Sequence, residues 1–198
     1  MSDEIRIAGD RDLRASVDTV DADACVVAAP PHPQMGGSRS DARLRAVGDA
    51  LADEGVACLR FDYGPWDEGD GEQQDVLTAL AYAREHFEWV GLFGYSFGAG
   101  VTLLAAADAD PVPTRVAVLA PPASIGAFDT VAALDEIDAP LTVVYGERDT
   151  TVDWEPVVER ARERGATVEA IPGDHFFVGQ VDAAASAVVS GLAALGDR

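Results

Sequence analysis

The sequence has 198 residues, enough for one buried core but few for two, so we expect a single domain spanning residues 1–198. It carries 35 acidic side chains against 14 basic ones, a formal net charge of −21, and contains no lysine. Such a charge disfavours contact with phosphate backbones and anionic lipids, which excludes nucleic acid and membrane as expected partners. No apolar run approaches the roughly 20 residues that cross a bilayer. Because the acidic N-terminus does not resemble a signal peptide, we expect a cytoplasmic protein.

The absence of lysine and the excess of aspartate resemble proteins from salt-loving microbes such as haloarchaea. Molar salt screens the self-repulsion that would otherwise oppose folding of so charged a chain. An acidic disordered chain is the alternative explanation. The hydrophobic fraction of 48% argues against it, because disordered chains are poor in apolar residues. We therefore expect a folded, halophilic protein.

Taken in chain order, the elements alternate between short apolar runs and longer amphipathic segments. Weak alternation at residues 5–7 and 13–17 predicts antiparallel edge strands. Buried strands are predicted at residues 25–29, 56–61, 89–93, 116–119, 141–145 and 168–171, and helices between about 38 and 55, at 72–86, after residue 100 through 107, at 155–164 and at 181–195. This pattern is typical of an α/β fold with parallel strands joined by crossover helices.

Two local features refine this prediction. Ser38 or Ser40 is the expected N-cap of the first helix, whose apolar face would be residues 44, 47 and 51. Cys25 and Cys58 each lie in an apolar run, which predicts buried free thiols in place of a disulfide or a metal site. Ligands of such open sheets bind beyond the carboxyl ends of the strands, so chemistry is expected in the loops at that rim.

The segment Gly-Tyr-Ser-Phe-Gly at residues 94–98 lies between a predicted buried strand and a helix of small residues. A serine in this context stands on the tight strand-to-helix turn called a nucleophile elbow. Glycines on either side let the strand and helix approach closely while the hydroxyl stays accessible. Ser96 is therefore the candidate nucleophile.

A serine hydroxyl needs a base to take its proton, and a neutral histidine is the usual one. Of the three histidines, His86 lies near a helix end and His32 lies close to the expected oxyanion loop. His175 follows the last strand and is the candidate base. The third member is a carboxylate between serine and histidine in chain order, and Asp149 follows the penultimate strand.

Other carboxylates remain alternatives to Asp149, namely Glu147, Asp153 and Asp174. For the oxyanion hole we expect the backbone N–H of Phe97 and, because Pro33 has no N–H, that of Gln34. A rigid turn without catalytic function is the other interpretation of the Gln34 loop. Candidate substrate-binding residues near the rim are Met35, Tyr63, Trp66, Tyr95 and Phe176.

With these residues in place, the chain resembles the α/β-hydrolase superfamily over nearly its whole length. It is most similar to small lidless members of the dienelactone-hydrolase-like and predicted acyl-hydrolase groups. The resemblance is carried by residues 94–100, by Gly-Glu-Arg-Asp at 146–149, by Gly-Asp-His-Phe-Phe at 173–177, and by the loop at 31–37, which is similar to a His-Pro-x-x-Gly-Gly loop. Residues 59–62 and 69–72 resemble the next strand and helix start of that group. Two features differ: dienelactone hydrolases use a cysteine nucleophile, and residues 63–66 replace an Arg-Gly-type turn.

The resemblance implies a mostly parallel sheet with helices on both faces and no large lid. It further implies a serine hydrolase that cleaves a carboxylic ester or thioester of a small substrate through an acyl-enzyme, without metal or organic cofactor. Hydrolysis of an amide bond is one alternative. A non-catalytic binding or scaffold protein that keeps the fold is another, because fold alone does not determine function.

The charge generates the first testable prediction: folding and activity should require molar salt. At low salt, repulsion among unscreened carboxylates should lower the free energy of unfolding. Thermal melts in low and in multimolar potassium chloride measure this effect. A melting temperature that is the same in both would contradict a halophilic surface.

Overall fold

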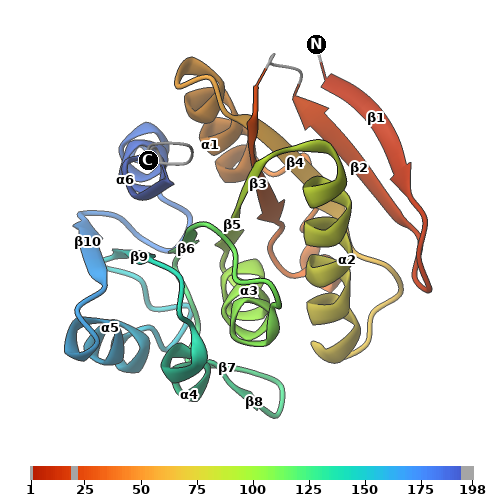
Figure 1. The fold of residues 1–198 in the computed structure, drawn as a ribbon. Coiled ribbons are helices and arrows are strands. Elements are labelled where there is room, and N and C mark those ends of the chain that lie inside the picture. The colour runs from red at the N-terminus through yellow and green to blue at the C-terminus, as the bar shows by residue number, and fades with distance from the viewer. Residues whose placement is uncertain (1, 19–21, 193–198) are drawn as a thin grey trace.

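The computed structural model describes residues 2–18 and 22–192. Its centre is an eight-stranded sheet with the order β1-β2-β4-β3-β5-β6-β9-β10 (Figure 1). β2 (Leu13–Asp18) pairs antiparallel with β1 (Ser2–Ile7) and with β4 (Ala57–Asp62). All other neighbouring strands are parallel: β3 (Ala24–Ala29), β5 (Trp89–Tyr95), β6 (Val116–Leu119), β9 (Leu141–Gly146) and β10 (Thr167–Ile171).

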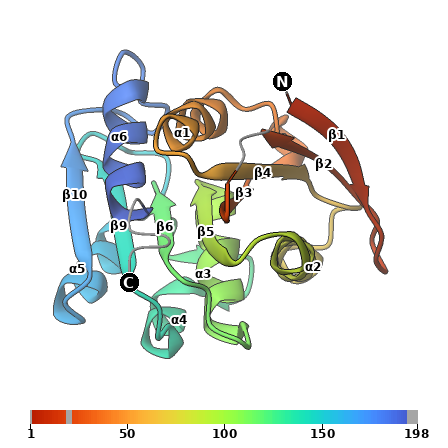
Figure 2. The same cartoon turned by 45° about the horizontal axis from the view of Figure 1, so that its top comes forward.

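Helices cover both faces of this sheet. They are α1 (Ala42–Asp53), α2 (Asp70–His86), α3 (Phe97–Asp108), α4 (Thr130–Ala133), α5 (Glu155–Glu163) and α6 (Val181–Leu192). Figure 2 shows α1 and α6 on one face and α2, α3 and α5 on the other. The predicted sheet architecture is therefore confirmed, including the two antiparallel strands at one edge.

Period-two alternation along the buried strands divides the core into two layers. Val27 of β3 packs in the layer that contains Leu80 and Leu103, whereas its neighbour Val26 packs with Leu44 of α1. Every residue of β3 is buried, because helices lie on both of its faces. This explains why the central strands appear in the sequence as continuous apolar runs.

Several details differ from the sequence-based prediction. The N-cap of α1 is Asp41 in place of Ser38 or Ser40. A turn closed by the Asp41 N–H and the Ser38 carbonyl precedes the helix, and the Asp41 carboxylate accepts the Arg43 N–H at 2.8 Å. β5 continues to Tyr95, since its last residues pair with β6. A short hairpin, β7 (Ser124–Ile125) and β8 (Phe128–Asp129), follows β6 and was not predicted. Residues 193–195 of the predicted last helix lie outside the described residues.

The two cysteines are buried and free, as expected. They lie on neighbouring strands but in different layers of the core, so their side chains point to opposite faces of the sheet. Burial raises the pKa of the Cys25 thiol to about 12. A thiol with so high a pKa stays protonated at neutral pH and acts as a small core residue.

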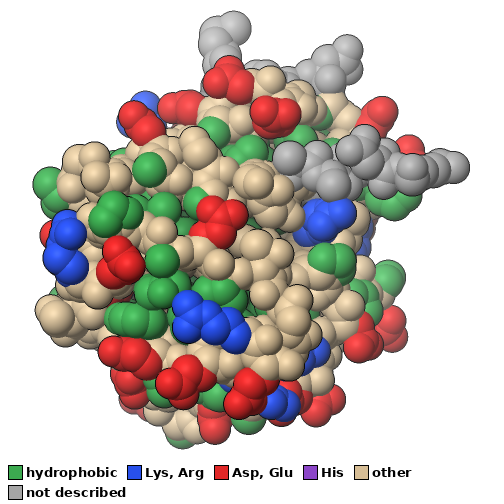
Figure 3. Space-filling view, turned by 90° about the vertical axis from the view of Figure 1, so that its left-hand side faces the viewer, with side chains coloured by type: hydrophobic (Ala, Val, Ile, Leu, Met, Phe, Trp, Pro, Cys, Tyr) green, Lys and Arg blue, Asp and Glu red, His purple; other side chains and the backbone are tan. Residues whose placement is uncertain are grey.

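The charged groups lie mainly on the surface. Figure 3 shows acidic side chains distributed over one face with arginines between them. Arg160, for example, bridges Asp135 and Glu163 at 2.6 and 2.7 Å. Within residues 2–18 and 22–192, no helix is long and apolar enough to span a bilayer.

Candidate active site

The loops at the carboxyl ends of the strands meet around two adjoining cavities. The smaller cavity, of about 230 Å³, is lined by Ser96 after β5, Thr151 after β9 and His175 after β10. The larger one, of about 630 Å³, also contains Ser96 and extends toward the loop after β6. Both are open on one side, and Ser96 lies at their junction.

Ser96 stands on a strained turn between β5 and α3. Its φ and ψ of 58° and −121° lie in a region that non-glycine residues rarely adopt, and its N–H donates to the Leu119 carbonyl at 2.9 Å. A Cβ on Gly94 would lie 2.1 Å from the Gly98 carbonyl oxygen, and one on Gly98 would lie 2.3 Å from that of Ala29. The glycines are therefore required by the close approach of α3 to the strand ends.

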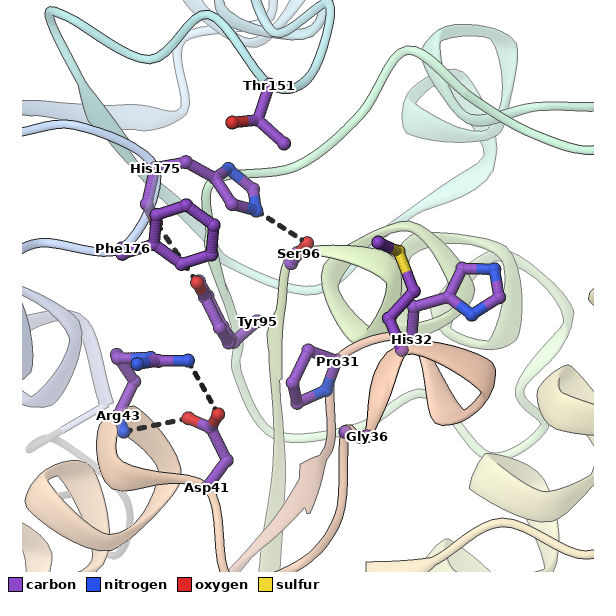
Figure 4. A pocket seen from close by; sticks show the side chains of 12 residues that line it. Pro31, His32, Gly36, Asp41, Arg43, Tyr95, Ser96, Thr151, His175 and Phe176 are labelled. Atoms are coloured by element: carbon purple, nitrogen blue, oxygen red, sulfur yellow. Dashed lines mark hydrogen bonds and ion pairs between the residues drawn. The ribbon is translucent and has the colours of Figure 1, made fainter.

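Ser96, His175 and Asp149 form a continuous hydrogen-bonded row. Ser96 Oγ lies 2.8 Å from His175 Nε2, and His175 Nδ1 lies 2.7 Å from Asp149 Oδ2. Figure 4 shows the imidazole of His175 pointing at Ser96. When Nδ1 donates its proton to the carboxylate, Nε2 is left with a lone pair directed at the hydroxyl. The hydroxyl is thus placed beside a proton acceptor.

The carboxylate of Asp149 is buried, with a side-chain exposure of 1%, and it is fully hydrogen-bonded. Its second oxygen accepts the backbone N–H groups of Thr151 at 2.8 Å and Val152 at 3.3 Å. These bonds compensate for the loss of hydration and hold the carboxylate toward the imidazole. The loop that follows β9 supplies both donors.

The alternative carboxylates lie elsewhere. Glu147 and Asp153 are exposed, and the exposed Asp174 accepts backbone N–H groups of its own loop. His86 lies at the end of α2, where Nδ1 is 2.8 Å from the Tyr82 carbonyl oxygen. None of these side chains lines either cavity in the described part of the chain.

His32 lines both cavities, but the histidine that is hydrogen-bonded to Ser96 Oγ is His175. Its ring stacks on Trp66 with a centroid distance of 4.7 Å and lies 4.8 Å from the ring of Phe97. Burial lowers the pKa of His32, so the imidazole is neutral near pH 7. It acts as a wall between the two cavities.

Gln34 and Phe97, the residues expected to supply the oxyanion hole, line the larger cavity together with Ser96. Gln34 is in a 3-10 turn (Pro33–Met35) after β3, and Phe97 is the first residue of α3. Among the described residues, neither N–H has a hydrogen-bond partner. Free N–H groups at a helix start and a tight turn suit an anionic oxygen.

The predicted substrate-binding residues separate into two groups. Met35, Trp66 and Phe176 line the cavities, and Met35 and Phe176 are exposed at their mouths. Tyr95 reaches the smaller cavity, but it is buried and its hydroxyl donates to the His175 carbonyl at 3.0 Å. Tyr63 lines neither cavity.

The position of Tyr63 corrects the expectation that it faces substrate. Its hydroxyl donates to the Pro30 carbonyl at 3.0 Å, and its ring packs edge-on against Phe61 and Phe97. Burial raises the pKa of this phenol well above its usual value. Tyr63 therefore supports the loop after β3 on the side that faces away from the cavities.

Several lining residues were not identified from the sequence. The larger cavity is lined by Pro122 and by Ser124, Ile125 and Gly126 of the β7–β8 hairpin, and the smaller one by the N-cap Asp41 and by Arg43 of α1. Strands of two residues carry no periodic signal, and an arginine in an amphipathic helix is indistinguishable from a surface residue. Within the described residues, no group of three or more His, Cys, Asp or Glu side chains is arranged to hold a metal ion.

Comparison with known proteins places this site in a class. The sequence pattern of the serine hydrolase (FSH1) family matches residues 12–180. XC6422 from Xanthomonas campestris, an α/β serine hydrolase without a lid, superposes with a TM-score of 0.84 and 26% identity, covering 100% of this chain and 96% of that one. A dienelactone hydrolase from Anabaena variabilis gives 0.80 and 20%, covering 98% of both chains. The esterase Pf2001 from Pyrococcus furiosus gives 0.82 and 19%, covering 98% and 92%. No curated protein matches the sequence.

The fold is thus the α/β-hydrolase fold of lidless serine hydrolases, as the sequence motifs predicted. The family match spans most of the chain, including Ser96 and His175. The chain belongs to the serine hydrolase (FSH1) family and is a serine hydrolase.

The elbow generates a prediction about stability. Gly98→Ala should lower the free energy of unfolding by about 3 kcal/mol or more, because its Cβ would meet rigid backbone of β3. Gly55→Ala is the matched control, since nothing lies near its Cβ and the cost is limited to about 1–2 kcal/mol for its left-handed conformation. Chemical unfolding in high salt measures both. Equal losses would contradict a steric role for Gly98.

Proposed function

We propose that this serine hydrolase cleaves a carboxylic ester or thioester of a small substrate, with Ser96 as nucleophile, His175 as general base and Asp149 as its partner. The observation that carries the proposal is the row of two short hydrogen bonds from Ser96 Oγ through His175 to Asp149. Such a row, on an elbow with free N–H groups beside it, has the geometry required for acyl transfer.

In the first half-reaction, Nε2 of His175 takes the Ser96 proton as Oγ attacks the carbonyl carbon. The new negative charge forms on the carbonyl oxygen, where the N–H groups of Phe97 and Gln34 are available as donors. Asp149 stabilises the imidazolium, which then protonates the departing alcohol or thiol. Water, deprotonated by His175, releases the acid from the acyl-enzyme in the second half.

An ester bond is the favoured target for two reasons. Structures similar to this chain include a dienelactone hydrolase and an esterase, both of which act on such bonds. The site is also open, with no segment folded across the cavities in the part of the chain that the structure describes, so small substrates reach Ser96 directly. We further propose that the net charge of −21 adapts this enzyme to a salt-rich cytoplasm.

The catalytic assignment predicts the behaviour of single and double variants. Ser96→Ala and His175→Ala should each remove nearly all turnover of a nitrophenyl ester, and the double variant should lose scarcely more, because groups that act as one unit are not additive. Asp149→Asn should lower kcat by about 10⁴-fold, as a wrong histidine tautomer does in a serine protease.

Glu147→Gln and Asp153→Asn are the matched controls for Asp149→Asn, because each removes one carboxylate charge from the same loop without touching His175. Both should retain most of the activity. Each variant must show a native unfolding curve in high salt before its rate is compared. Near-normal kcat in folded Asp149→Asn, with a collapse in either control, would assign the acid to another carboxylate.

The open cavities predict a preference for short acyl chains. Walls such as Trp66, Ile125 and Val152 enclose the first few carbons, whereas further methylenes would remain in water and gain no transfer free energy. We expect a higher kcat/KM for acetate and butyrate esters than for dodecanoate esters of the same nitrophenol. The opposite order would show that a long chain is bound outside the described cavities.

A further inference from the structure

The smaller cavity contains a cation that the proposed reaction does not use. Arg43 of α1 lines it, and within the described residues no other Arg lines either cavity. Figure 4 shows Ser96 and His175 at one end of this cavity and Arg43 at the other, with the ring of Tyr95 between them. In a protein whose charge is −21, a positive group in the cavity that contains the nucleophile requires an explanation.

Arg43 is held in position from two sides. Its Nη2 donates to Asp41 Oδ2 at 2.6 Å, and its guanidinium carbon lies 4.8 Å from the ring centre of Tyr95. The other oxygen of Asp41 is occupied, because it accepts the Arg43 backbone N–H at 2.8 Å. The cation is therefore pre-oriented, and its side chain is only 20% exposed.

One donor of this guanidinium is buried and has no acceptor among the described residues. A guanidinium has five N–H donors, and Arg43 directs one of them to Asp41 while its group lies against the Tyr95 side chain. Nε is buried without a partner. Partly buried donors without acceptors are costly unless a ligand satisfies them, and a carboxylate or phosphate matches a guanidinium best.

The position of His175 decides which part of the substrate enters this cavity. The leaving oxygen or sulfur must lie near Nε2 to receive its proton, and His175 lines the smaller cavity but not the larger. Phe97 and Gln34, the expected oxyanion donors, line the larger cavity but not the smaller. The acyl group therefore belongs in the larger cavity, and the alcohol or thiol part belongs in the smaller.

We infer that Arg43 is a specificity-determining residue that binds an anionic group, a carboxylate or phosphate, on the alcohol or thiol part of the substrate. This inference rests on the proposed function. It narrows the substrate class to small acyl esters or thioesters whose leaving group carries a negative charge a few bonds from the ester.

The test compares two acetate esters that differ only in charge, 3-carboxyphenyl acetate and its neutral analogue 3-carbamoylphenyl acetate. The ratio of their kcat/KM values should fall about tenfold in Arg43→Gln relative to the wild type, the loss of one charge-assisted contact. Arg43→Lys keeps the charge but loses the paired N–H donors of the guanidinium, so it should retain part of the preference for the carboxylate ester.

Arg45→Gln is the matched control, because Arg45 is exposed on the same helix and lines neither cavity. It changes the net charge equally, so its ratio should equal that of the wild type. A second pair carries the charge on the acyl side, namely phenyl hydrogen succinate and phenyl succinamate, and should show no dependence on Arg43. An equal fall in Arg45→Gln, or an Arg43 effect confined to the acyl-side pair, would overturn the inference.

Binding to the Ser96→Ala protein separates this inference from the proposed function. Calorimetry should show that 3-hydroxybenzoate binds about tenfold more tightly than 3-hydroxybenzamide, and that Arg43→Gln in the same background abolishes the difference. If the wild type cleaves no ester but this preference is present, the proposed reaction fails and the anion site stands. If the wild type cleaves esters but the Ser96→Ala protein binds 3-hydroxybenzoate and 3-hydroxybenzamide equally well, the anion site is wrong and the proposed reaction stands. Should Arg43→Gln not fold, the wild-type preference and the Arg43→Lys ratio decide.

Discussion

The contact between the first turn of α3 and the ends of β3 and β5 controls the position of Ser96, to which the other groups of the site are directed. With no Cβ on Gly94 or Gly98, the helix start approaches the backbone of β3 so closely that a methyl group would overlap it. That approach forces Ser96 into a left-handed conformation and presents its hydroxyl at the rim. Within residues 2–18 and 22–192, the N–H of Phe97, the residue after Ser96, has no hydrogen-bond partner. Strain at one residue is thereby balanced by packing along a buried helix.

Hydrogen bonds to buried groups then orient the row of Asp149, His175 and Ser96. Asp149 is tolerated in an almost dry position because backbone N–H groups and His175 satisfy its oxygens. Tyr95 adds a second support, since its hydroxyl holds the backbone carbonyl of His175 while Asp149 holds the ring. The imidazole is therefore positioned through both its backbone and its side chain, and its free nitrogen faces Ser96.

Charged groups on the surface and charged groups in the site differ in how firmly they are held. Outside the cavities most carboxylates are on the surface, with Glu72 and Asp75 as buried exceptions, and an exposed ion pair contributes little to stability individually. Inside the smaller cavity, Arg43 is packed on Tyr95 and paired with the N-cap carboxylate Asp41, so its orientation is set before any ligand arrives. Preorganised charge of this kind selects among ligands more strongly than the diffuse field of the whole molecule.

The sequence by itself determined the sheet, the crossover helices and the candidates Ser96, His175 and Asp149, because strands buried on two faces leave continuous apolar runs and their carboxyl ends meet at one rim. Tertiary structure alone decided which carboxylate reaches His175, that Tyr63 packs behind the loop, and that Arg43 faces the cavity. Those outcomes depend on loop paths and on contacts between distant segments, which no local periodicity encodes.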